Sequence, residues 1–198
     1  MKQSTSVAKR VKLLTVFDAL TLSLLTIPVV FSLLRSKIVE FVGYAIFLLG
    51  GLSPHLYERV VGQNLDVKVR FGLSSTVLLH SLFGQFLDFY EYFPGWDKLL
   101  HFYGSFVITI FFFETLRQSS KFWNAKNIPD ALFMAFLLGT FVGLVWEIAE
   151  YMADKIFPYI GAQRGLDDTM MDFIFNVLGC YSAVQAIKYS LRQRDVRR

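Results

Sequence analysis

Acidic, amide and imidazole side chains recur at helical spacing in the second half of the sequence. Asp97 and His101 are four residues apart, and Asp168, Asp172 and Asn176 follow one another at the same interval. Residues four apart lie on one face of an α-helix, so we expect each set to point in one direction. A carboxylate beside an imidazole is suited to metal ligation, or to a carboxylate that orients a general base. The oxygens of the second set favour a hard divalent cation.

The segment between these two sets adds further candidate acids and one candidate basic residue, Arg164. Gly139, Gly143 and Glu147 also follow one another at intervals of four, and small residues at this spacing commonly pack membrane helices. We therefore expect Glu147 to face protein rather than lipid, with Glu150 on an adjacent stripe. Arg164 is a candidate clamp for an anionic group of a substrate.

A histidine upstream could belong to the same site. His80 shares a spacing of four with Gly84 and Asp88, which predicts one helix face. His80 either joins the metal ligands or hydrogen-bonds a neighbouring helix without chemistry. A histidine among oxygen ligands would favour Mn²⁺ or Zn²⁺ over Mg²⁺ or Ca²⁺.

The candidate residues form two overlapping groups, and no organic cofactor is indicated. The candidate metal ligands are His80, Asp97, His101, Glu147, Glu150, Asp168, Asp172 and Asn176. The candidate catalytic residues are His101, Glu147 and Arg164. A non-catalytic interpretation also remains: Asp97 and Asp168 would cap their helices, and Asp172 would pair with Arg164.

The composition is that of a membrane protein. The chain has 198 residues, of which 54% are hydrophobic and 18% charged, and its mean hydropathy is +0.45. Its apolar residues fall in blocks of roughly 18–22, long enough to cross a bilayer. Acids at membrane depth are costly and usually mark function. The single cysteine, Cys180, excludes an intrachain disulfide and a site built from several thiolates.

The expected architecture is one all-α integral membrane domain, 1–198, with six spans. Most of the 20 Lys and Arg residues fall in segments on the same side as the termini, which predicts both termini inside. The net charge of +4 is then a topology signal, and no nucleic-acid partner is expected. The polar residues described above would lie near the outer surface. The expected spans are 13–34, 38–57, 69–90, 97–116, 130–153 and 168–189.

The same residues carry a resemblance to known families. The segment Trp96–Phe102 resembles the Asp-x-x-x-His-Phe signature of the YjdF-like bacterial inner-membrane proteins, and more distantly the VanZ-like family. The segment Trp146–Tyr151 resembles the Trp-Glu-x-x-Glu motif of the YjdF-like group. The segment Gly165–Asp172, followed by Asn176 and Gly179, resembles the terminal motif of both families.

The resemblance implies a multi-pass protein of the bacterial inner membrane and leaves its activity open. YjdF-like proteins have no established activity, and VanZ-like proteins are associated with glycopeptide resistance or envelope stress. Three functions therefore remain. The first is a metal-dependent hydrolase or transferase acting on lipid or cell-envelope substrates. The second is a proton or cation transporter, and the third is a non-catalytic accessory protein. The expected partner is the lipid bilayer, and the pattern does not indicate an oligomeric state.

Overall fold

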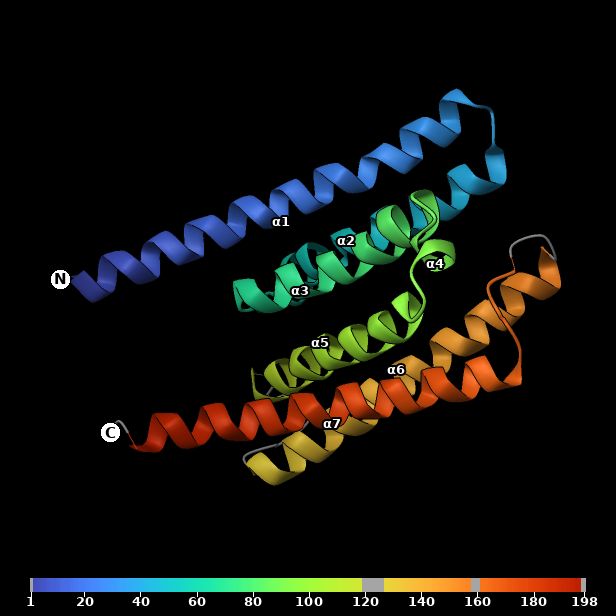
Figure 1. Cartoon of the computed structure of the whole chain (residues 1–198). Coiled ribbons are helices and arrows are strands. Elements are labelled where there is room, and N and C mark those ends of the chain that lie inside the picture. Colours follow the sequence, from blue (N-terminus) through green and yellow to red (C-terminus); the bar gives the residue numbers. More distant parts are fainter. Residues whose placement is uncertain (1, 119–126, 158–160, 197–198) are drawn as a thin grey trace. The chain divides into compact units, whose positions relative to one another are not determined.

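The computed structural model describes residues 2–118, 127–157 and 161–196, and every regular element in these ranges is helical. Five of the described helices are long and apolar enough to cross a membrane (Figure 1). This confirms the predicted all-helical membrane bundle. The expected loops around 119–126 and 158–160 lie outside the described residues. The five helices are α1 (Lys2–Leu34, apolar from Thr15), α2 (Ile38–Val61), α5 (Trp96–Gln118), α6 (Ile128–Ile156) and α7 (Leu166–Val196).

The expected third span is the element that departs most from its prediction. It consists of α3 (Val67–Leu78) and a π-helix, η1 (Leu79–Phe86), followed by the short α4 (Phe89–Tyr92). The helix therefore ends at Phe86 rather than at residue 90. Asp88 lies beyond it with a φ of 57°, in the left-handed region.

This change of helix type corrects the prediction that His80, Gly84 and Asp88 share one face. A π-helix has more residues per turn than an α-helix, so a spacing of four no longer repeats on the same side. His80 and Gly84 are buried within η1, whereas Asp88 is exposed outside it.

The helices form two compact units, residues Met1–Trp96 and Asp97–Arg198, which we describe separately. The single domain expected from the sequence stays a prediction. In the first unit α1, α2 and α3 pack against one another. Leu25, Leu78 and Leu82 form the buried centre of this packing.

A buried ion-pair network joins these three helices. Asp18 of α1 is 2% exposed, and its Oδ2 accepts a hydrogen bond from Arg70 Nε at 2.8 Å. The same oxygen lies 3.1 Å from His55 Nε2. Arg70 also pairs with Glu58, at 3.0 Å between Nη1 and Oε2. Asp18 of α1 is thus held by Arg70 of α3.

The second unit is held together by glycines at helix contacts. Gly179 of α7 lies against the backbone of Phe102 in α5, where an added Cβ would be 3.0 Å from the carbonyl carbon. Gly143 of α6 lies against Asn176 of α7, where an added Cβ would be 2.7 Å from the carbon and nitrogen of the side-chain amide. These contacts confirm that the glycine stripe on α6 packs against protein. They bring α5, α6 and α7 close enough for short polar side chains to meet.

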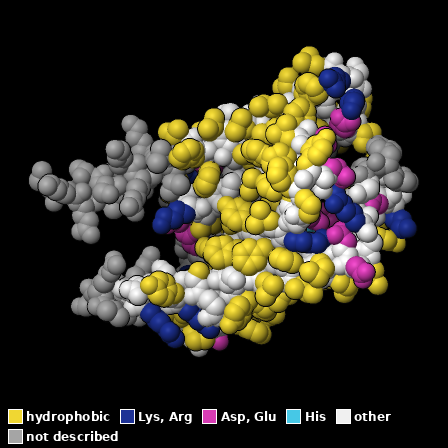
Figure 2. All heavy atoms as spheres, in the orientation of Figure 1, with side chains coloured by type: hydrophobic (Ala, Val, Ile, Leu, Met, Phe, Trp, Pro, Cys, Tyr) yellow, Lys and Arg dark blue, Asp and Glu magenta, His cyan; other side chains and the backbone are white. Residues whose placement is uncertain are grey.

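The outer surface of the helices is apolar. On α6, Phe133 is 62% exposed, Phe141 59% and Ile148 52%. Figure 2 shows hydrophobic side chains over much of the visible surface. So much exposed apolar area is unusual for a monomer in water, but it is expected for helices in contact with lipid tails.

Candidate functional site

His101 is the centre of the polar cluster in the second unit. Its Nδ1 lies 3.2 Å from Asn176 Oδ1, which also accepts a hydrogen bond from the Ser105 hydroxyl at 2.7 Å. All three residues are buried. With Asn176 Oδ1 as the acceptor, which can only accept, Nδ1 of His101 carries the hydrogen in this tautomer. This contact fixes the orientation of the imidazole ring, so that Nε2 points away from Asn176.

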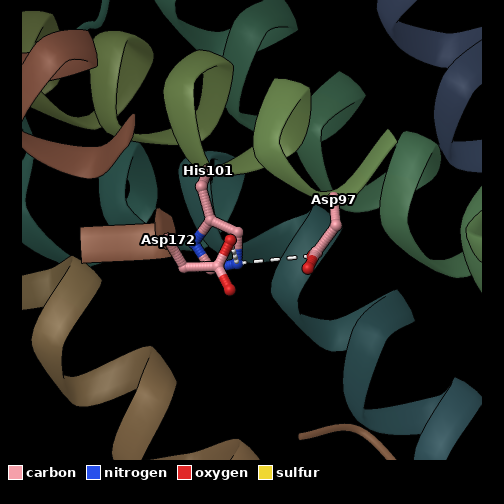
Figure 3. Close-up of side chains that lie close together, drawn as sticks. All are labelled: Asp97, His101 and Asp172. Carbon is pink, nitrogen blue, oxygen red and sulfur yellow. Dashed lines mark ion pairs between the residues drawn. The ribbon is translucent and has the colours of Figure 1, made fainter. Parts of the chain in front are cut away.

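Nε2 of His101 faces three carboxylate oxygens. Asp97 Oδ1 lies at 3.4 Å, Glu147 Oε1 at 3.4 Å and Asp172 Oδ1 at 3.6 Å. Figure 3 shows the carboxylates of Asp97 and Asp172 directed at the edge of the His101 ring. Asp97 is in the first turn of α5, Glu147 is on α6 and Asp172 is on α7, so all three helices of the unit contribute.

These distances are longer than typical hydrogen bonds and would suit the ligands of one shared cation. Hydrogen bonds from nitrogen to oxygen are typically about 2.7–3.2 Å long. Two ligands of a tetrahedral ion with bonds of about 2.0–2.2 Å are roughly 3.3–3.6 Å apart. One ligand atom from each of Asp97, His101 and Asp172 lies within 4.8 Å of the other two, and a second such set is His101, Glu147 and Glu150.

A buried oxygen without a hydrogen-bond partner also points to a ligand. Glu147 is 3% exposed, and its Oε2 accepts a hydrogen bond from Gln163 Nε2 at 3.2 Å. Its Oε1 has no hydrogen-bond partner within the described residues. Leaving a buried acceptor unsatisfied costs about 1–3 kcal/mol, and more for a charged group. A bound cation close to His101, or a proton on this oxygen, would remove this cost.

Lys98 supplies the positive charge that is present in the cluster itself. Its Nζ lies 2.8 Å from Asp172 Oδ1 and 3.2 Å from Asp97 Oδ2, and it also pairs with Asp168. One ammonium thus serves three carboxylates, of which Asp172 is the most buried. The pairing neutralises part of the acidic charge. The carboxylates around His101 Nε2 still outnumber this one ammonium.

The remaining candidates of this unit lie at its edge. Glu150 accepts a hydrogen bond from the indole nitrogen of Trp146 at 2.8 Å and belongs to the second ligand set. Asp168, in the first turn of α7, contacts Lys98 rather than His101. Arg164 is exposed on the segment between α6 and α7.

His80 belongs to the first unit. Its Nδ1 lies 2.5 Å from the Tyr90 hydroxyl, and its ring packs edge-on against Phe47 with centroids 4.6 Å apart. The structure therefore gives His80 the neighbours of a hydrogen-bonded histidine within its own unit. Its role as a metal ligand stays a prediction.

Three polar residues of the site were not among the candidates from the sequence. Ser105 follows His101 at the same spacing of four, so extending that face would have found it. Lys98 directly follows Asp97 and is not on the same stripe of the helix, so this spacing does not predict it. Gln163 lies in a segment without periodicity. Its amide connects Glu147 to the Thr169 hydroxyl, which donates to Gln163 Oε1 at 2.9 Å.

Comparisons with known proteins agree with the membrane character of the chain and name no activity. Residues 17–194 match the family described as "Predicted membrane protein (DUF2238)". An uncharacterized protein of Thermotoga maritima is 55% identical over 165 residues, which cover 83% of this chain and 85% of that protein. No solved structure matches the chain.

Proposed function

The chain belongs to the DUF2238 family of predicted membrane proteins, and on that premise we propose that its second unit binds one divalent cation. We propose further that the ion serves the hydrolysis or transfer of a phosphoryl or acyl group of a membrane lipid or cell-envelope substrate. Asp97, His101 and Asp172 are the proposed ligands. Glu147 forms a separate set with His101 and Glu150, so we assign it as the proton acceptor.

One observation carries this proposal. The Nδ1 hydrogen of His101 is directed to Asn176, and Nε2 is then surrounded by three carboxylate oxygens at 3.4–3.6 Å. In known metal sites a ligating histidine gives its other ring hydrogen to an oxygen in the same way. Imidazole together with carboxylates favours Mn²⁺ or Zn²⁺ over Mg²⁺ or Ca²⁺.

The cluster also contains the groups that such a reaction requires. A divalent ion in this position would polarise a phosphoryl or acyl oxygen. Glu147 has a buried oxygen free to accept a proton from an attacking water or hydroxyl. Asn176 and Ser105 hold His101 in place, and Gln163 holds Glu147.

Elemental analysis of the purified full chain tests the metal. After equilibration with Mn²⁺ or Zn²⁺ and removal of free ions, we expect about one ion per chain. Asp172→Asn should lose it, because Asp172 is a buried ligand. Asp167→Asn is the matched control, since Asp167 is an exposed aspartate on the same helix. No bound metal in the wild type with Mn²⁺, Zn²⁺, Mg²⁺ or Ca²⁺ would overturn the proposal.

Activity is tested with the same samples. The metal-loaded chain is incubated with dispersed phospholipids, and the release of phosphate, head group or fatty acid is measured. Turnover should disappear in Asp172→Asn and after chelation, and persist in Asp167→Asn. Stoichiometric metal without turnover on any of these lipids would keep the metal site and refute the lipid hydrolase.

A non-catalytic role is the second candidate, and Lys98 is the observation that favours it. Its ammonium already pairs with three aspartates, so the cluster could serve only to hold α5 and α7 together. In that case Asp172→Asn would lower stability and metal would be absent from the wild type. The elemental analysis therefore separates the two candidates.

The assignment to the YjdF-like group and to a bacterial inner membrane is part of the proposal. The motif resemblance to the YjdF-like proteins is in keeping with a family of predicted membrane proteins. A bacterial inner membrane is the proposed location, supported by the Thermotoga relative and by the apolar helices. Neither the YjdF-like motifs nor the Thermotoga relative indicates a reaction. The residues of the site therefore remain the basis of the functional proposal.

A further inference from the structure

We infer that a cavity beside the carboxylate cluster binds the anionic head group of a membrane amphiphile. The inference rests on the proposed function, because it supplies the substrate class for that site. The cavity has a volume of about 410 Å³ and is formed by the end of α6, by Gln163 and Gly165, and by the start of α7. Its walls include Tyr151, Asp154, Lys155, Gln163, Leu166 and Thr169.

Lys155 gives the cavity an available positive charge. Its Nζ lies 5.1 Å from the centre of the Tyr151 ring, and none of the ion pairs among the described residues includes it. Asp154 is the nearby acid, but its two oxygens accept hydrogen bonds from the backbone nitrogens of Ala162 and Gln163, both at 2.8 Å. Asp154 therefore holds the backbone of the cavity wall in place, and the ammonium of Lys155 is available to bind an anion.

The position of the cavity indicates an amphiphile rather than a free anion. Helix α6 has 29 residues and is about 43 Å long, whereas the hydrocarbon core of a bilayer is about 30 Å thick. Its end therefore reaches the layer of lipid head groups. Tyr151 is 51% exposed and Leu166 is 73% exposed, which gives a hydrocarbon chain apolar surface next to the charge.

Gln163 places the cavity beside the proposed proton acceptor. Its side chain lines the cavity and donates to Glu147 Oε2 at 3.2 Å and to the Glu147 backbone oxygen at 3.4 Å. Its Oε1 is held by the Thr169 hydroxyl. A head group in the cavity would thus be one side chain away from Glu147. This is the arrangement expected where a lipid phosphoryl or acyl group is presented to the cluster.

Retention of defined lipids by the full chain tests the inference. The protein in neutral detergent is mixed with dioleoyl phosphatidic acid or with dioleoyl phosphatidylcholine, and bound lipid is counted by native mass spectrometry. We expect one phosphatidic acid per chain and weaker retention of phosphatidylcholine. Lys155→Gln should weaken retention of phosphatidic acid about fivefold, the effect of one basic residue at a membrane surface, while Lys155→Arg should preserve it.

Two controls make the result specific. Lys188→Gln removes an exposed lysine on another part of α7 and should leave retention unchanged. Excess inorganic phosphate should not displace the lipid. Equal retention of both lipids, no effect of Lys155→Gln, or the same effect from Lys188→Gln would overturn the inference. Displacement by free phosphate would assign the cavity to a soluble anion and also overturn it.

The same samples separate this inference from the proposed function. Asp172→Asn should lose the metal yet retain phosphatidic acid, because Asp172 does not line the cavity. Metal binding without selective lipid retention would refute the cavity alone. Selective retention without metal in the wild type would refute the metal site alone.

Discussion

Replacing Gly179 by alanine should damage both the stability and the site of the second unit. An added Cβ would lie 3.0 Å from the carbonyl carbon of Phe102 and closer still to its oxygen. Ordinary contacts begin at 3.4 Å, so the carbonyl carbon alone requires a separation of about 0.4 Å, and the closer oxygen requires the helices to separate by more than that. The obstacle is backbone, which cannot rotate away. Overpacking of this kind costs about 1–3 kcal/mol.

The expected loss can be measured by thermal unfolding in detergent, followed by tryptophan fluorescence. A loss of about 2 kcal/mol should lower the melting temperature by roughly 4–8 °C for a chain of this size. Gly43→Ala is the matched control, because Gly43 is helical and has no heavy atom within 4 Å of an added Cβ. Alanine there should be neutral or stabilising by up to about 1 kcal/mol, the difference in helix propensity.

The site provides a second readout of the same substitution. Asp97 and His101 are on α5 and Asp172 is on α7, so moving α7 away from α5 increases the ligand distances. Metal binding by Gly179→Ala should therefore weaken, while Gly43→Ala should bind as the wild type does. Equal melting temperatures and equal metal binding for the two variants would refute the close packing of α5 against α7.

Three further predictions concern polar and charged groups within the helices. Arg70→Met should destabilise the chain by about 3–5 kcal/mol, because it leaves Asp18 buried without its main partner; adding Asp18→Asn should recover part of the loss in the same melting assay. Asn176→Ala should weaken Mn²⁺ binding about 10–100-fold in a titration followed by electron paramagnetic resonance, and unchanged affinity would argue against His101 as a ligand. Lys98→Met should strengthen Mn²⁺ binding at least about tenfold, since it removes a competing charge next to Asp172; weaker binding would show that Lys98 supports the site instead.

Helical spacing predicted the centre of the candidate site well. Asp97 and His101 share one face of α5, and Asp172 and Asn176 share one face of α7, because both helices are regular over these residues. The glycine stripe of α6 correctly placed Glu147 on a packed face. These inferences needed only the period of the helix and the size of glycine.

Features that depend on residues far apart in the chain could not be predicted from helical spacing. The π-helix at Leu79–Phe86 shifts the faces of the third span, and no residue in it is a recognised signal for that change. Gln163 acts through contacts to Glu147 and Thr169 on two different helices. Arg70 meets Asp18 across 52 residues, and nothing local marks that pairing.

The long separation of the site residues along the chain has a consequence for biogenesis. His101 on α5 hydrogen-bonds Asn176 on α7, 75 residues later, and synthesis of that stretch takes roughly 4–15 s at ordinary translation rates. Throughout this time Lys98 and His101, in the first two turns of α5, lack their partners on α7 and have Asp97 of their own helix as an acidic neighbour. The first of the three helices should therefore stay beside the insertion machinery, or near the aqueous surface, until the last one arrives.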